Sequence, residues 1–460
     1  MFVVCFQTTT IANAPQHCVI LPLRVETKYT DGMKTTQDKK IIKEKMQSFV
    51  SEGYLFASKM REQAGLAADS LKPFTIQMFG KPATIVRGEE GVNFFYDESK
   101  IKRDGGMPAP ISDALFGKGA VHTLDDEAHK VRKNAMADMA YDDARVEKFK
   151  PLVAEEIQKT IRSWRTNPGN IYDDFAIAYG KAAFRWAGIP MNEKQMVKRA
   201  KQYSHLLDTF GSPVKNVLAQ IDRKKLDNYF QSVIQDVRMG ELRVAPDSVV
   251  QYIADLKDEN GELLDAKLAG IELQNLTRPT VAVSRFAAFA AVALVQNPDW
   301  AEKVRKATAQ AGTLTDIPEA IAFAQEVRRV YPFVPMLPGV AKEDTEVSGC
   351  PIQKGQRVLI DIVGTHNSPD LWENAADFDP QRFMDIDDYE KITAFLPQGG
   401  HGVRTGHRCP GEKIAIAALS ASVAALADEK VQISKDPLDT SFSWKSILTR
   451  PETGVRVSVK

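Results

Sequence analysis

A glycine-rich loop with a single cysteine constrains the fold of this chain more than any other segment. The loop spans residues 395–412 (FLPQGGHGVRTGHRCPGE), and Cys409 lies near its end, directly before the apolar run GEKIAIAALSASVAALADE. Glycines let a backbone pass close to a flat or bulky partner, because no side chain limits φ. The start of the following helix favours a thiolate over a thiol. Cys409 is therefore predicted to be a metal ligand or a nucleophile, and the alternative is a structural core cysteine.

Two further motifs precede the loop and favour a metal ligand over a structural core cysteine. They are EVRR at residues 326–329 and FDPQRF at residues 378–383. Glu326 and Arg329 are three residues apart, so they share one face of a helix. The three motifs, in this order, resemble the cytochrome P450 family, in which a cysteine thiolate is the axial ligand of a haem iron. The resemblance implies that Cys409 holds the iron of haem b and that Arg382 joins Glu326 and Arg329.

The periodicity of the chain predicts a mainly α fold with a small β region. Residues 126–245 are mostly helical in pattern, as are residues 38–65, while FTIQMFGKPATIVRG predicts a hairpin and RVLIDI a strand. No linker or repeat divides the chain, so we expect one large domain at residues 37–460. Residues 1–36 are expected to be a disordered or non-native extension. The family resemblance implies a single-domain cytochrome P450 fold, with the haem buried between a central distal helix and the proximal cysteine loop and helix.

Charge and cysteine usage exclude several classes of partner. Sixty basic and sixty acidic residues cancel, which indicates neither a nucleic-acid nor an anionic-membrane partner. The four cysteines show no paired or metal-type spacing, which fits a reducing cytosol. The first apolar stretch, MFVVCF, is too short to cross a bilayer. We therefore expect a cytoplasmic protein without a membrane span.

Residues 276–295 (LTRPTVAVSRFAAFAAVALV) form the second informative stretch. They are apolar nearly all round, which predicts a helix through the core. Pro279 costs about 3 kcal/mol in a helix interior, so it needs a justification. A buried guanidinium such as that of Arg278 needs an anion, and Glu272 is not at helical contact spacing. A carboxylate suits the fork of donors, so Arg278 is predicted to bind the head of a long-chain fatty acid.

The aromatic residues Phe286 and Phe289 of the same helix are predicted to contact the chain of that fatty acid. Two alternatives remain open. Pro279 could mark the first turn of the helix, which would leave Arg278 as a solvated end residue. Arg285, seven residues further on and on roughly the same face, is a rival for the carboxylate.

The motifs Arg278-Pro279-Thr280, Gln398-Gly399-Gly400 and Gly406-His407-Arg408-Cys409 resemble the bacterial fatty-acid peroxygenase and decarboxylase subfamily. The resemblance runs from about residue 52 to the C-terminus. The common haem-loop pattern has Phe, Gly and Arg where this chain has Gly402, Thr405 and His407, but the subfamily has the same lengthened loop. The acid–alcohol pair of the common oxygenases is absent from the central helix, where Arg278 and Pro279 stand instead.

This resemblance implies oxidation of fatty acids at the α and β carbons by hydrogen peroxide, without an obligatory redox partner. The substrate carboxylate, held by Arg278 beside Pro279, would act as acid and base. His122 matches a position that is His in the member noted for making terminal alkenes and Gln in hydroxylating members, and Phe116 matches the aromatic residue beside it. Both hydroxylation and decarboxylation are therefore expected. The alternative for His122 is a loop histidine bonded to backbone.

Three basic residues, Arg103, His129 and Lys133, resemble the family's contacts to the haem propionates, and two more cofactor-site residues, His407 and Arg408, flank the thiolate; from the sequence alone each could also be a surface charge. Two other functions compete with the peroxygenase. One is a monooxygenase fed by a reductase, and the other is a haem or lipid-binding protein without catalysis.

Overall fold

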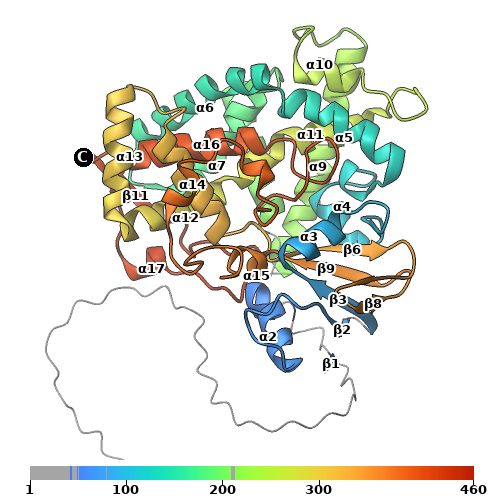
Figure 1. The fold of residues 1–460 in the computed structure, drawn as a ribbon. Coiled ribbons are helices and arrows are strands. Elements are labelled where there is room, and N and C mark those ends of the chain that lie inside the picture. Colours follow the sequence, from blue (N-terminus) through green and yellow to red (C-terminus); the bar gives the residue numbers. More distant parts are fainter. Residues whose placement is uncertain (1–41, 44–48, 50, 79, 209–212) are drawn as a thin grey trace, which may run out of the picture. The chain divides into compact units, whose positions relative to one another are not determined.

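A computed structural model describes residues 42–43, 49, 51–78, 80–208 and 213–460, and these are the residues discussed below. Figure 1 shows a helical region beside a smaller β region, which confirms the predicted mainly α class. The extension predicted for residues 1–36 lies outside the described residues. The helices are α2 (Phe56–Gln63), α3 (Gly88–Tyr96), α4 (Ala109–Leu115), α5 (Asp126–Ala140), α6 (Asp143–Ser163), α7 (Ile171–Trp186), α8 (Glu193–Leu207), α9 (Pro213–Arg238), α10 (Val249–Ala254), α11 (Ala266–Ala282), α12 (Ser284–Gln296), α13 (Pro298–Ala311), α14 (Pro318–Val330), α15 (Ile362–His366), α16 (Glu412–Leu426) and α17 (Pro437–Thr440).

The main sheet has six strands in the order β1-β2-β3-β9-β6-β4. The predicted hairpin is confirmed, because β2 (Phe74–Met78) pairs antiparallel with β3 (Lys81–Val86), and the predicted strand is β9 (Arg357–Asp361). The strands β6 (Met336–Ala341) and β4 (Ile101–Lys102) complete one edge. The remaining strands are β5 (Gly169–Asn170), β10 (Val431–Ile433) and β11 (Arg456–Val459) in one small sheet and β7 (Thr345–Val347) with β8 (Cys350–Ile352) in another.

The helix predicted for residues 38–65 is wrong over part of its length. Ile42–Lys43 is the strand β1, which pairs in parallel with β2, whereas Phe49, Ser51 and Glu52 are helical and α2 begins at Phe56 after a 3-10 turn at Gly53–Leu55. The pairing with Ile76 and Gln77 depends on a segment more than thirty residues away in the sequence. A local periodicity cannot report such a partner, so tertiary pairing overrides the helical pattern.

The predicted core helix is interrupted once. Asp265 caps α11 by accepting from the N–H of Lys267 at 2.9 Å, so the helix begins well before Pro279. The interpretation of Pro279 as a first-turn residue is therefore wrong. The interruption falls at Val283, between α11 and α12. Residues 266–296 are long and apolar enough to cross a membrane, but 78% of their most apolar window is buried inside the protein, as in a core helix.

The helix that follows the cysteine loop is a second core helix. Every residue of α16 from Ile414 to Leu426 is buried, and the segment is rich in alanine, the best helix former. It packs against α6, α12 and α14, and it also contacts α11. The helix that follows the cysteine loop therefore contacts the helix that carries Arg278.

Candidate active site

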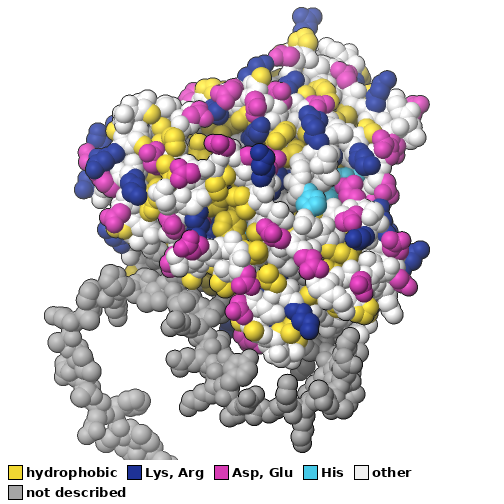
Figure 2. Space-filling view, viewed as in Figure 1, with side chains coloured by type: hydrophobic (Ala, Val, Ile, Leu, Met, Phe, Trp, Pro, Cys, Tyr) yellow, Lys and Arg dark blue, Asp and Glu magenta, His cyan; other side chains and the backbone are white. Residues whose placement is uncertain are grey.

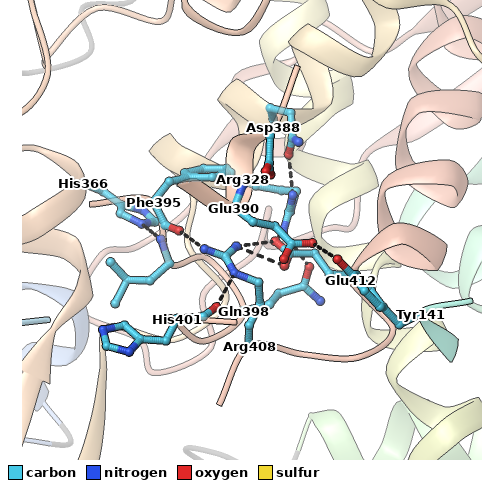
Figure 3. A network of polar contacts seen from close by, with 12 residues as sticks. Tyr141, Arg328, His366, Asp388, Glu390, Phe395, Gln398, His401, Arg408 and Glu412 are labelled. Carbon is cyan, nitrogen blue, oxygen red and sulfur yellow. Dashed lines mark hydrogen bonds and ion pairs between the residues drawn. The ribbon is translucent and has the colours of Figure 1, made fainter. Parts of the chain in front are cut away.

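Arg408 is buried and hydrogen-bonds backbone carbonyls of the cysteine loop (Figure 3). It is 1% exposed, and its Nε donates to the carbonyl of His401 at 2.9 Å while Nη2 donates to the carbonyl of Phe395 at 3.1 Å. Its Nη1 pairs with Glu412 at 3.1 Å, and Arg328 of α14 pairs with the same carboxylate. One buried carboxylate at the start of α16 thus ties the loop to two helices.

The predicted cluster of Glu326, Arg329 and Arg382 is confirmed. Glu326 accepts from Nε and Nη2 of Arg329 at 2.7 Å each, and Nε of Arg382 lies 3.6 Å from the same carboxylate. Arg329 also donates to the carbonyls of Ala375 at 3.0 Å and Asp377 at 2.9 Å. The cluster therefore holds the segment before the cysteine loop onto α14.

Cys409 is partly exposed and its N–H donates to the carbonyl of Gln398 at 2.9 Å. Burial raises the pKa of the Cys409 thiol, and the opposing effects of Lys133 and the amide of Gly411 are smaller. Desolvation therefore opposes the thiolate form of Cys409 in the free protein. A bound metal ion reverses this balance, because a coordinating thiol is deprotonated outright.

The three predicted propionate residues, Arg103, His129 and Lys133, lie in one cluster with His407. The rings of His129 and His407 stack with centroids 4.5 Å apart, and burial lowers the pKa of each to about 4. Burial lowers the pKa of Lys133 to about 8, with Cys409 opposing the shift. Nη1 of Arg103 is buried without a hydrogen-bond partner among the described residues. Such a set of donors, one of them unpaired, fits the two propionates of a haem.

Glu98 belongs to this cluster, although the sequence did not single it out. Its carboxylate lies 3.3 Å from Nε2 of His407 and 3.8 Å from Nδ1 of His129. His407 hydrogen-bonds Glu98 and holds the pKa of that carboxyl below its usual value. No local pattern connects Glu98 to the loop, so only the folded chain brings the two together.

Arg278 lies in α11 and is 4% exposed. Nη2 donates to Oδ1 of Asn275 at 2.9 Å, whereas Nη1 is buried and has no partner in the part of the chain that the structure describes. Burial lowers the pKa of Arg278 to about 9, and the nearby Arg223 adds to the shift. A buried guanidinium with an unpaired donor is costly, so the site is suited to an anion.

Phe116 lies between Arg278 and His122. Its ring centroid is 5.8 Å from Cζ of Arg278 and 4.1 Å from that of His122, with the two rings 11° from parallel. His122 has an exposed side chain, yet the protein around it lowers its pKa to about 3, mainly through desolvation and then through Arg278. The predicted packing of Phe116 against His122 is thus confirmed.

The other predicted substrate contacts lie in core packing. Arg285 donates to Asp208 at 3.1 Å and lies near the carbonyl of Thr449, so its guanidinium already has an anionic partner. Phe289 stacks on Tyr331 with centroids 4.3 Å apart, and Phe286 lies 6.1 Å from the ring of Phe333. The roles predicted for Phe286 and Phe289 in substrate binding remain predictions.

A family model described as Cytochrome P450 matches residues 188–455, more than half of the chain. The chain belongs to the cytochrome P450 family. It is an oxidoreductase whose cofactor is a haem iron held by a cysteine thiolate. The loop motif in the sequence predicts that Cys409 takes that position.

Curated relatives are distant. The sterol 14alpha-demethylase of Mycolicibacterium vanbaalenii is 22% identical over 74% of this chain and 79% of its own length, and cytochrome P450 26B1 of Danio rerio is 26% identical over 74% and 71%. The probable cytochrome P450 513D1 of Dictyostelium discoideum is 28% identical, but this chain spans only 38% of its length. This chain spans 48% of the length of cytochrome P450 76C4 of Arabidopsis thaliana.

Solved structures are similar over nearly the whole chain. A variant of cytochrome P450 OleT in complex with arachidonic acid is 27% identical, with a TM-score of 0.82 over 91% of this chain and 97% of that one. Cytochrome P450EX alpha (CYP152N1) with myristic acid is 28% identical, with a TM-score of 0.80 over 91% and 98%. These neighbours agree with the subfamily resemblance found in the sequence.

Proposed function

We propose that this protein is a fatty-acid peroxygenase, which uses hydrogen peroxide to oxidise long-chain fatty acids at the α and β carbons. The products are hydroxy acids and, through His122, terminal alkenes formed with loss of CO₂. The observation that carries the proposal is the unpaired, buried Nη1 of Arg278. Two structural neighbours bind arachidonic acid and myristic acid, which supports a fatty acid as the anion.

Arg278 binds and orients the substrate. Asn275 holds one end of the guanidinium, and Nη1 remains available to a carboxylate. A buried charged hydrogen bond fixes both the position and the angle of its partner, so only carbons close to the carboxylate reach the reaction centre. A substrate without a carboxylate is therefore expected to react poorly.

The cofactor and the proton-handling groups have separate tasks. Haem, when bound through Cys409 and held at its propionates by Arg103, His129, Lys133 and His407, supplies the redox chemistry of peroxide. The carboxylate held by Arg278 serves as acid and base for the peroxide protons. His122 is neutral, so its ring offers one donor and one acceptor beside that carboxylate. No redox partner is required, and we place the protein in the cytoplasm.

The test is incubation of the holoprotein with palmitate or myristate and hydrogen peroxide, with products identified by gas chromatography. We expect turnover with peroxide alone. Turnover only with NADPH and a reductase would instead support a monooxygenase, and fatty-acid binding without product would support a non-catalytic protein.

Arg278→Ala should retain its haem and its carbon-monoxide spectrum but lose about a hundredfold in kcat/KM, since a buried charged contact to the substrate is removed. Arg278→Lys keeps the positive charge but loses the forked pair of donors, so its kcat/KM should lie between those of the wild type and Arg278→Ala. Full activity of Arg278→Ala on palmitate would show that this residue does not clamp the carboxylate.

A further inference from the structure

One buried carboxylate joins the two elements of the proposed site. Glu272 is fully buried in α11, six residues before Arg278. Oε1 accepts from the backbone N–H of Val121 at 2.9 Å and from Nη1 of Arg132 at 3.0 Å. Oε2 accepts from Nδ2 of Asn275 at 3.0 Å. Burial raises the pKa of Glu272, and its hydrogen bonds to Asn275, Arg132 and Val121 oppose that shift. Because all three partners donate, the ionised carboxylate is the form that satisfies them.

On the helix side, Glu272 controls Arg278 through Asn275. An ionised carboxylate can only accept, so Asn275 must turn its amide nitrogen toward Glu272. That orientation leaves Oδ1 facing Arg278, which donates to it at 2.9 Å. The direction in which the guanidinium points therefore depends on a residue that it does not touch.

On the loop side, the same group holds the segment that ends at His122. The N–H of Val121 donates to Glu272 directly. Arg132, the ion-pair partner of Glu272, also donates to the carbonyl of Gly119 at 3.1 Å. Asn275 donates to the carbonyl of Phe116 at 3.2 Å. Residues 116–121 are thus held at three backbone positions, two of them by side chains of α11 and one by Arg132 of α5, the partner of Glu272.

We propose that Glu272 is the positioning residue that sets the separation of Arg278 and His122. It thereby controls how tightly the fatty-acid carboxylate is held and how the products divide between alkene and hydroxy acids. The inference rests on the proposed function for its consequences, but the contacts of Glu272 exist without a substrate. Glu272 itself makes no contact with the substrate carboxylate and acts through Asn275 and the loop.

The variant Glu272→Gln replaces one carboxylate oxygen with a donor. That donor must face another donor, so at least one contact to the loop or to Asn275 is lost. Glu156→Gln is the matched control. Glu156 is 2% exposed and pairs with Lys181 and Arg185, so the same charge is removed from a comparable buried group whose partners lie outside the site.

Three measurements on holoprotein with an intact carbon-monoxide spectrum test the inference. Deuterium uptake at residues 116–124 should rise in Glu272→Gln. The Kd of palmitate, from the shift of the haem absorbance, should rise about tenfold, as expected for one lost hydrogen bond to a charged group. The ratio of 1-alkene to hydroxy acid should change. Glu156→Gln should leave all three at the wild-type values.

Wild-type uptake and wild-type Kd in folded Glu272→Gln would overturn the inference. If palmitate causes no shift in the wild type, the proposed function fails, and deuterium uptake alone still decides whether Glu272 holds the loop. If Glu272→Gln does not retain haem, Asn275→Ala replaces it, because that change leaves the pair of Glu272 and Arg132 intact. An unchanged palmitate Kd in Asn275→Ala would then overturn the inference.

Discussion

At the scale of single residues, burial decides which groups of the site carry charge. Desolvation lowers the pKa of His122 to about 3, so its imidazole is neutral at ordinary working pH, while Arg278 keeps its charge because its pKa falls only to about 9. The two groups therefore divide the work. Arg278 attracts the carboxylate, and His122 offers a donor and an acceptor without repelling the guanidinium.

His122→Gln tests this division of work. Glutamine keeps one donor and one acceptor but cannot transfer a proton, so the alkene share of the products should fall while hydroxy acids persist. The products are measured by gas chromatography at equal conversion of myristate. His205→Gln is the control, because His205 is exposed and paired with Asp222. Equal alkene shares in His122→Gln and the wild type would contradict the role of His122.

At the scale of elements, the cysteine loop is positioned by buried charge on α14 and α16. Arg328 and Arg408 share Glu412 at the start of α16 (Figure 3). Arg329 joins α14 to the segment before the loop. Buried ion pairs contribute little net stability over apolar packing, but removing one partner leaves a buried charge. These residues therefore specify where the loop lies.

Arg329→Ala should lower the free energy of unfolding by about 3–5 kcal/mol, because the buried carboxylate of Glu326 loses its two short bonds to Arg329 and keeps only the longer contact to Arg382 and the N–H of Asp379. Arg305→Ala removes a partly exposed pair with Glu302 and should cost less than about 1 kcal/mol. Urea unfolding of the two variants beside the wild type measures both values. A similar small loss in both would show that the buried cluster is not required.

At the scale of the whole molecule, His366 links three segments that are far apart in the sequence. It lies at the end of α15, its Nδ1 is 2.9 Å from the carbonyl of Arg329, and its Nε2 accepts from the N–H of Leu396 at 3.0 Å. The second bond requires an unprotonated Nε2, so the neutral ring is the form that fits. Burial lowers the pKa of His366 to about 3.

This shift makes the protein sensitive to acid. Below pH 6.5 the unfolded chain binds a proton at His366 that the native protein does not, so stability is complete above that pH and declines toward about pH 3. The contribution is about 1.4 kcal/mol for each pH unit in this window. His366→Gln removes this titration, so its unfolding free energy, from urea curves at pH 4.5, 5.5 and 7, should depend less on pH. Parallel curves for the two proteins would contradict the assignment.

Much of the fold and part of the site could be predicted from short patterns. The hairpin at β2 and β3, the buried helix around Arg278 and the cluster of Glu326 with Arg329 depend on neighbours within a few residues or a few turns. Their periodicity is therefore visible along the chain. The strand β1 was missed because its partner β2 lies more than thirty residues away in the sequence.

By itself, the sequence determined the chemistry that the site can hold. Two patterns are visible in the sequence without knowledge of the fold. One is a cysteine after a glycine-rich loop, and the other is an arginine beside a proline in an apolar helix. The tertiary structure alone decided how those groups are held, because their supports come from distant segments. Glu272 pairs with Arg132, which is 140 residues away in the sequence, and Glu98 pairs with His407, which lies in the distant cysteine loop. A buried polar group must be satisfied by whatever the fold brings beside it, and only the folded protein reveals that partner.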